Sequence, residues 1–191
     1  VKPPTSALTA IGLNNNNVAT IKLIKFKRFI TEEIKIINWQ FFPKSKVLPD
    51  HLSDVLGVFA FYQGLIDSDC NNLNSNEVLE TVRIGLENQG YQIEKSKKTV
   101  DKIKVPVLFG INGKLEKYFE ADGYDKISKT VIEVEAGRAV TNYQFLKDLF
   151  QACIMFDIDY LIISVRNNYR GNPDFQNVNT FLDTLYVSDR L

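Results

Sequence analysis

The stretch TVIEVEAGRAVTNYQFLKDLFQACIMFDIDYLIISV, residues 130–165, determines the fold class of this chain. Within residues 130–136, apolar and acidic side chains alternate with the two-residue period of a strand. Thr141 and Gln144 then have the spacing of a helix capping box, which predicts a second element of helical type. The apolar stripe of that helix comprises Leu146, Leu149, Phe150 and Cys153. Residues 160–165 form a short apolar run typical of a buried parallel strand. The order predicts a βαβ unit with a right-handed crossover.

A helix is predicted upstream of this unit. Asn74 is followed by Glu77 at capping-box spacing, with Asn in place of the usual Ser or Thr. Apolar residues then recur at helical spacing, and Gly90 marks the end of the helix. They are Val78, Leu79, Val82 and Leu86.

A β-hairpin is predicted between that helix and the βαβ unit. Residues 105–111 resemble a strand, Asn112-Gly113 is a strong two-residue turn signal, and residues 114–124 return as the partner strand. Residues 178–185 carry a final short helical stripe. We therefore expect an α/β fold with a mixed central sheet flanked by helices, in the order α-β-β-β-α-β.

The domain organisation follows from length and patterning. A chain of 191 residues suits a single domain, residues 1–191. Residues 1–72 are expected to form an N-terminal arm or a subdomain packed on the core, residues 73–191. The first twenty or so residues are predicted to be a loose arm or a long turn. Residues 21–42 leave strand and helix equally open, and residues 52–65 are apolar enough to pack on the core.

Composition excludes several classes of protein. No apolar run is long enough to span a bilayer and no secretion signal is evident, so we expect a cytoplasmic protein without membrane contact. Cys70 and Cys153 are too few for a disulfide framework or a zinc finger. The single histidine, His51, excludes mechanisms that need two, and its context suggests a structural or surface role. Basic and acidic residues balance at 23 each, so any nucleic-acid contact must come from local clusters.

Acidic residues are concentrated on the predicted strands. Side chains two apart on a strand share a face, which places Glu133 and Glu135 together with Val131 and opposite Ile132 and Val134. The ordinary interpretation is that Glu133 and Glu135 face solvent on one side of an edge strand. The βαβ unit that follows instead predicts a central strand, where two acids on one face need a reason.

Pairing of the two strands would add a third acid. Asp122, near the end of the preceding strand, would then meet Glu133 and Glu135. Three close carboxylates repel one another unless a cation neutralises them. Carboxylate oxygens with an incomplete protein shell suit Mg²⁺, with Mn²⁺ as a possible substitute. The residues therefore predict a hard-metal site and do not by themselves specify a reaction.

The segments Glu120-Ala-Asp122-Gly-Tyr and Val131-Ile-Glu133-Val-Glu135-Ala-Gly137, followed by a helix and residues 160–165, resemble the PD-(D/E)XK nuclease superfamily. That superfamily includes most type II restriction endonucleases and several repair and recombination nucleases. The resemblance covers about half the chain and implies a restriction-endonuclease-like core. Ala121 stands at the proline of the motif, and Glu135 replaces the lysine, as in the Glu-x-Glu variant.

The resemblance implies roles for individual residues. Asp122, Glu133 and Glu135 would be catalytic, with the metal held by Asp122 and Glu133 and the attacking water oriented by Glu135. Glu77 would support the metal, or Glu80 would do so in its place. The alternative for both residues is that of an ordinary helix acid that faces solvent. Because the lysine of the motif is absent, a catalytically inactive member of the superfamily remains an alternative.

Basic residues near these segments are candidates for contacts with nucleic acid. Arg138 follows the acidic strand and could touch a phosphate, with a surface salt bridge as the alternative. Lys95, Lys97, Lys98, Lys102 and Lys104 form a cluster that could neutralise phosphates, although such runs are usually solvated faces. Gly110-x-x-Gly113-Lys114 lacks the spacing of a phosphate-binding loop, so no nucleotide cofactor is expected.

The hypothesis with most support is a Mg²⁺-dependent endonuclease of the type II restriction class. Its partner would be double-stranded DNA, cut by a homodimer whose twofold axis matches a palindromic site. One alternative is a structure-specific repair or recombination nuclease. Another is a catalytically inactive nucleic-acid-binding module of the same fold.

Overall fold

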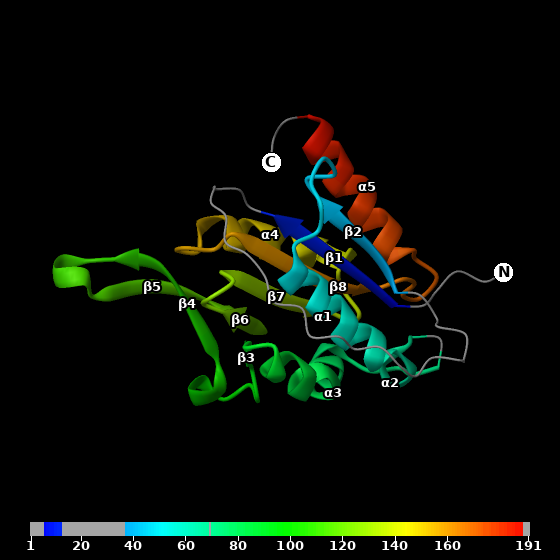
Figure 1. Cartoon of the computed structure of the whole chain (residues 1–191), viewed down its shortest axis with the longest axis horizontal. Helices are drawn as coiled ribbons and strands as arrows, with labels where there is room; N and C mark the ends of the chain where they lie inside the picture. Colours follow the sequence, from blue (N-terminus) through cyan, green and yellow to red (C-terminus); the bar gives the residue numbers. More distant parts are fainter. Residues whose placement is uncertain (1–5, 13–36, 69, 189–191) are drawn as a thin grey trace.

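A mixed β-sheet forms the centre of the molecule (Figure 1). The computed structural model describes residues 6–12, 37–68 and 70–188. Within them, six strands follow the order β2-β1-β8-β7-β6-β3. Their bounds are β1 Ser6–Gly12, β2 Asn38–Phe42, β3 Gln92–Ile93, β6 Gly123–Asp125, β7 Thr130–Glu135 and β8 Tyr160–Arg166. The pairs β1–β2 and β7–β8 are parallel, and the other neighbours are antiparallel. The expected mixed sheet of an α/β protein is confirmed.

Helices cover both faces of the sheet (Figure 1). One face carries α1 (Asp50–Phe61), α2 (Gln63–Ile66) and α3 (Ser75–Asn88). The other carries α4 (Gln144–Ile154) and α5 (Asp174–Val187). No helix in the described part of the chain is both long and apolar enough to span a bilayer.

The βαβ prediction is confirmed by β7, α4 and β8. Strands β7 and β8 lie side by side and parallel, from Thr130 opposite Tyr160 to Glu135 opposite Val165. Strand β6 pairs with the other edge of β7, so β7 is a central strand. Ile132 and Val134 pack into the core under α1 and α3. Val131 packs into the core under α4 and α5, as the alternation predicts.

The capping box predicted for α3 is confirmed. The Glu77 amide donates to Asn74 Oδ1 at 3.2 Å, and the Asn74 amide donates to Glu77 Oε2 at 2.7 Å. The four apolar residues expected on its inner face, Val78, Leu79, Val82 and Leu86, are all buried. A reciprocal cap thus fixes where α3 begins, and its stripe fixes which side faces the sheet.

The second predicted capping box is wrong. Helix α4 begins at Gln144 without a side-chain cap, and its N-cap residue is Tyr143. The preceding residues form a short 3₁₀ turn, η3 (Thr141–Tyr143), in which Asn142 and Tyr143 have left-handed backbone angles. Thr141 therefore lies at the start of η3 and not at the N-cap position of α4.

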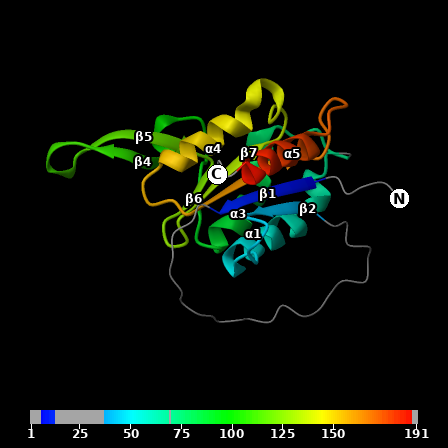
Figure 2. The same ribbon diagram turned by 90° about the horizontal axis from the view of Figure 1, so that it is seen from above.

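The predicted hairpin is present but forms a separate arm. Strands β4 (Ile103–Phe109) and β5 (Leu115–Ala121) make a two-stranded sheet that projects from the body in both views (Figures 1 and 2). A short 3₁₀ turn, η2 (Ile111–Gly113), joins them, with left-handed backbone at Asn112 and Gly113. That conformation is the one for which the Asn-Gly pair is favoured in tight hairpins.

The strand predicted over residues 114–124 is wrong in one respect, because it divides in two. Strand β5 pairs with β4 in the arm, whereas β6 pairs with β7 in the central sheet. The chain bends at Asp122 between them. One continuous run of alternating residues therefore serves two sheets.

The N-terminal third contributes to the same sheet. The expectation of a loose arm is wrong for β1, which pairs with β2 on one edge and β8 on the other. Residues 14–17 and 21–36 lie outside the described residues. Strand β2 resolves residues 38–42 of the undecided stretch as strand, and α1 and α2 occupy the apolar stretch that follows. The sheet therefore takes strands from both sides of residue 72.

The cysteines and the histidine belong to no group of metal-binding side chains among the described residues. Cys70 and Cys153 are both free and exposed. His51 packs against the ring of Tyr160, with ring centroids 4.9 Å apart, which fits the structural role expected of it.

Candidate active site

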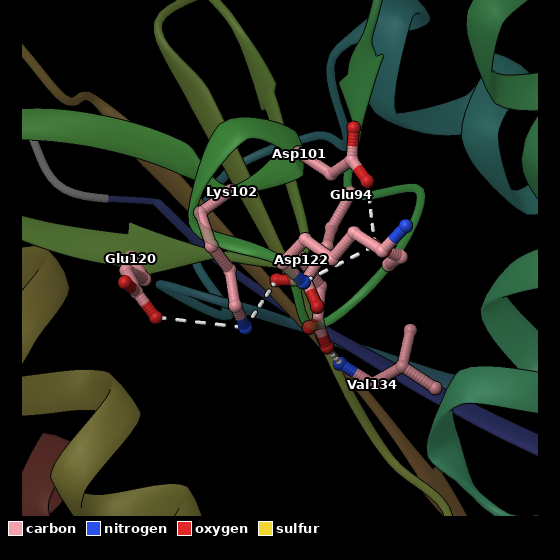
Figure 3. A network of polar contacts seen from close by, with 8 residues as sticks. Glu94, Asp101, Lys102, Glu120, Asp122 and Val134 are labelled. Carbon is pink, nitrogen blue, oxygen red and sulfur yellow. Dashed lines mark hydrogen bonds and ion pairs between the residues drawn. The ribbon is translucent and has the colours of Figure 1, made fainter.

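Asp122 lies at the bend where the arm joins the central sheet. Strand β6 pairs with β7 only as far as Gly123 opposite Ile132, which leaves the next backbone N–H of β7 on that edge, at Val134, without a strand partner. Asp122 Oδ2 accepts that N–H at 2.8 Å (Figure 3). Its backbone carbonyl accepts the Glu94 amide, also at 2.8 Å. The carboxylate thus replaces the missing strand and is fixed in position by it.

Glu133 and Glu135 lie on β7 and are half-buried. Both point to the face of the sheet that α4 covers, because Ile132 and Val134 occupy the other. The end of β7 is joined to α3, since the Ala136 amide donates to Ser75 Oγ at 3.0 Å. The two acids therefore stand on a strand held at both edges and at its end.

A cavity of about 730 Å³ joins these residues. Its lining includes Asp122, Glu133, Glu135 and Arg138, which are all residues selected from the sequence. Asn74, Ser75 and Asn76, at the start of α3, also line it. The structure thus brings the three predicted catalytic acids onto one concave surface.

A lysine and two glutamates form a network beside Asp122 (Figure 3). Lys102 Nζ lies 2.8 Å from Glu94 Oε2 and 3.5 Å from Glu120 Oε2. All three line the cavity. The hydrogen bond to Glu94 raises the pKa of Lys102, so its ammonium is held in the charged form. The sequence offered no signal for Glu94, whose position depends on the contact with Asp122.

Helix α4 brings a further acid, Asp148, that sequence reasoning missed. Asp148 is only 3% exposed, although it lies next to the exposed Lys147 that lines the cavity. Lys147 Nζ lies 3.4 Å from Asp148 Oδ1. A signal was present, because the residue interrupts an otherwise apolar helix face between Phe145 and Leu149.

Burial and mutual repulsion raise the pKa values of these acids. Burial is the largest cause for each. Burial raises the pKa of Asp122 to about 6. The hydrogen bond from the Val134 N–H lowers this pKa, whereas the charges of Glu94 and Asp148 also raise it. The pKa of Glu135 reaches about 7, with Asp148 and Asp122 adding to burial. Burial, followed by repulsion from Asp122 and Asp148, raises the pKa of Glu133 well above its usual range.

Cationic and aromatic residues line the same cavity. Arg138, Lys147, Arg166 and Arg170 are among them, with Tyr169 between the last two. The guanidinium carbons of Arg166 and Arg170 lie 5.4 and 5.2 Å from the centroid of the Tyr169 ring. Acidic and basic side chains therefore meet on one concave surface, in a protein whose net charge is zero.

Other residues selected from the sequence are not brought to the cavity. Glu77 does not line it, because its carboxylate closes the capping box of α3. Glu80 pairs with Arg83 on the exposed side of that helix. In the lysine cluster only Lys102 lines the cavity. The other four lysines are exposed and lie outside the cavity lining; they are Lys95, Lys97, Lys98 and Lys104.

The donor chemistry of the site suits a hard divalent cation. The candidate ligands are carboxylates whose charges repel, and Asp148 Oδ2 is buried with no hydrogen-bond partner in the described structure. Within residues 6–12, 37–68 and 70–188, however, no three acid, histidine or cysteine side chains are placed so as to hold one ion together. Asp122 gives one oxygen to Val134, so sharing an ion requires its neighbours to turn toward it.

Comparison with known proteins adds no relative. No protein-family model matches the sequence, and neither a curated protein nor a solved structure matches the chain. The functional argument therefore depends on the geometry of this cavity.

Proposed function

We propose that this chain is a Mg²⁺-dependent DNA endonuclease with a restriction-endonuclease-like core, of the type II restriction class. The observation that supports it most is the delivery of Asp122, from a bend, and of Glu133 and Glu135, from a central strand, to one cavity. Acids on a buried central strand are costly, and a function that uses them accounts for their presence.

Asp122 and Glu133 are the residues that would hold Mg²⁺ or Mn²⁺. Such an ion, when bound, lowers the pKa of a water molecule and offsets charge that builds up on a phosphate. Their donors are carboxylate oxygens, whose chemistry suits this ion, and the Val134 amide holds Asp122 in position.

Glu135 would position and activate the attacking water. Without a bound ion, burial together with the charges of Asp148 and Asp122 raises its pKa to about 7, so its carboxylate can take up a proton near neutral pH. In the reaction the water gives a proton to Glu135 and its oxygen bonds to phosphorus. The phosphorus–oxygen bond on the opposite side breaks, and the leaving oxygen takes a proton from solvent. Arg138 lines the same cavity and would pair with a phosphate oxygen of the substrate.

Cleavage of DNA tests the proposal. Purified protein and Mg²⁺ should cut duplex DNA, and Asp122→Asn or Glu133→Gln should abolish cutting. Glu80→Gln is a matched control, because Glu80 forms a surface pair with Arg83 outside the cavity. Cutting that survives in both site variants would refute the assignment of the site.

The pattern of products separates the two nuclease classes. Discrete fragments from intact plasmid indicate sequence-specific cutting, which a homodimer would perform most simply on both strands. Cutting confined to branched or single-stranded substrates would favour a repair or recombination nuclease.

A second candidate function is a non-catalytic nucleic-acid-binding module. Two observations favour it: the lysine of the motif is replaced by Glu135, and no three acids of the described residues are placed to hold an ion. DNA affinity without Mg²⁺ or Mn²⁺ binding, measured by calorimetry, would support this function over the first.

A further inference from the structure

Asp148 is a buried carboxylate on a helix face that is otherwise apolar. Phe145, Leu149 and Ala152 share that face of α4 and are buried in the core beneath α4 and α5. Asp148 is 3% exposed among them. An acid in such a position is costly unless a partner compensates for the lost hydration.

The described structure supplies little compensation. Oδ2 of Asp148 is buried and has no hydrogen-bond partner among the described residues. Oδ1 lies 3.4 Å from Lys147 Nζ, but the Lys147 side chain is 57% exposed and therefore well screened by water. A buried oxygen without a protein partner needs an explanation, and binding of an ion is one of the recognised ones.

The surroundings of Asp148 are the acids of the proposed site. Lys147, whose Nζ lies 3.4 Å from Asp148 Oδ1, lines the same cavity as Glu133, Glu135 and Asp122. The charge of Asp148 also raises the pKa values of these acids. Helix α4 covers the face of the sheet to which Glu133 and Glu135 point. The groups that oppose the negative charge of these acids are Lys147, Arg138 at Glu135, and Lys102 at Asp122.

We propose that Asp148 is a fourth carboxylate of the cation site and binds the ion through its unpaired Oδ2, together with Glu133. This inference rests on the proposed function, and it adds a ligand that comes from a helix. A ligand on α4 would tie the ion to the layer that packs on β7, and binding would satisfy the buried oxygen.

Substitution of Asp148 by Asn tests this directly, because Asn keeps the shape and removes the charge. A ligand role predicts opposite effects in two measurements. Without metal, the melting temperature should stay level or rise, since repulsion among the acids is relieved. Mn²⁺ affinity by calorimetry should fall on the order of tenfold or more, and the Mn²⁺-induced rise in melting temperature should shrink.

Controls separate this inference from the proposed function. Asp54→Asn, on the exposed side of α1, should bind Mn²⁺ as the wild type does. Glu133→Gln should lose Mn²⁺ binding. If Asp148→Asn binds Mn²⁺ as tightly as the wild type while Glu133→Gln does not, the inference is wrong and the proposed function stands. If the wild-type chain binds no Mn²⁺, both are wrong.

A measurement on the wild type covers the case in which Asp148→Asn does not fold. Titration with Mg²⁺ should shift the carboxyl ¹³C resonance of Asp148 together with that of Glu133. A shift at Glu133 without one at Asp148 would overturn the inference.

Discussion

Helices α3 and α4 lie on opposite faces of the sheet, and each carries an acid next to a residue that lines the cavity. On α3 the acid is Glu77, whose carboxylate accepts the Asn74 amide and completes a capping box. On α4 the acid is Asp148, whose Oδ2 has no partner in the described structure. An acid with a local partner has a structural explanation. An acid buried without one calls for a functional explanation.

The two helices should contribute equally to stability through their apolar faces. Leu86 of α3 and Leu149 of α4 are both fully buried. Leu86→Ala and Leu149→Ala should each lower the free energy of unfolding by about 2–5 kcal/mol, because each leaves a cavity in a packed core. Urea denaturation measures this loss. If only one of the two variants loses stability, the helices differ in how they pack on the sheet and not only in the partners of their acids.

Cleavage should distinguish the two acids. Asp148→Asn should slow DNA cutting at limiting Mg²⁺ by about 10²-fold, at the upper end of what loss of a supporting group costs a metal site. Glu77→Gln should leave the rate within about twofold, because its carboxylate is engaged in the cap. Initial rates on a single substrate provide the measurement. The reverse ranking would restore Glu77 as the metal-supporting acid and remove Asp148.

Stability without metal should depend on pH through the acids around α4. Folding raises the pKa of Asp122 from 3.8 to about 6 and that of Glu135 from 4.5 to about 7. Between these values the folded chain binds more protons than the unfolded chain, so stability falls as pH rises. The free energy of unfolding in EDTA should therefore decrease from about pH 4 to about pH 7 through these groups.

Asp148→Asn should make that decrease shallower, since the charge of Asp148 raises both pKa values. Urea denaturation at a series of pH values measures the slope. A slope unchanged in this variant would mean that Asp148 is too far from the other acids to affect them.

The smallest effects concern how the two helices begin. Asn74→Ala should destabilise the protein by about 1 kcal/mol, because it removes the side-chain acceptor of the α3 cap. Thr141→Ala should change stability by less than about 0.5 kcal/mol, because Thr141 lies outside the N-cap of α4. Thermal denaturation of both variants is sufficient. A larger effect at Thr141 would mean that the capping box forms in solution.

Local patterns predicted much of the fold because their causes are local. The Asn74–Glu77 cap, the Asn112-Gly113 turn and the alternation of residues 130–135 each depend on neighbours in sequence. The capping box at Thr141 failed because left-handed residues intervene before α4. The strand over residues 114–124 was divided because pairing partners from two sheets compete for it.

The candidate site was predicted in part. Asp122, Glu133 and Glu135 were found because strand periodicity places acids on one face, and all three line one cavity. Glu94, Lys102 and Lys147 reach the same cavity from elements that no local pattern relates to β7. Their convergence depends on the crossover and on the bend at Asp122.

The sequence by itself determined the alternation of β7, the βαβ unit and the acids they carry, since periodicity and capping act over a few residues. Only the tertiary structure decided that Asp122 caps the unpaired edge of β7, that Glu77 is engaged in a helix cap, and that Asp148 Oδ2 is buried without a partner in the described structure. The physical reason is that hydration and hydrogen bonding of a carboxylate are set by groups distant in sequence, which packing alone brings together.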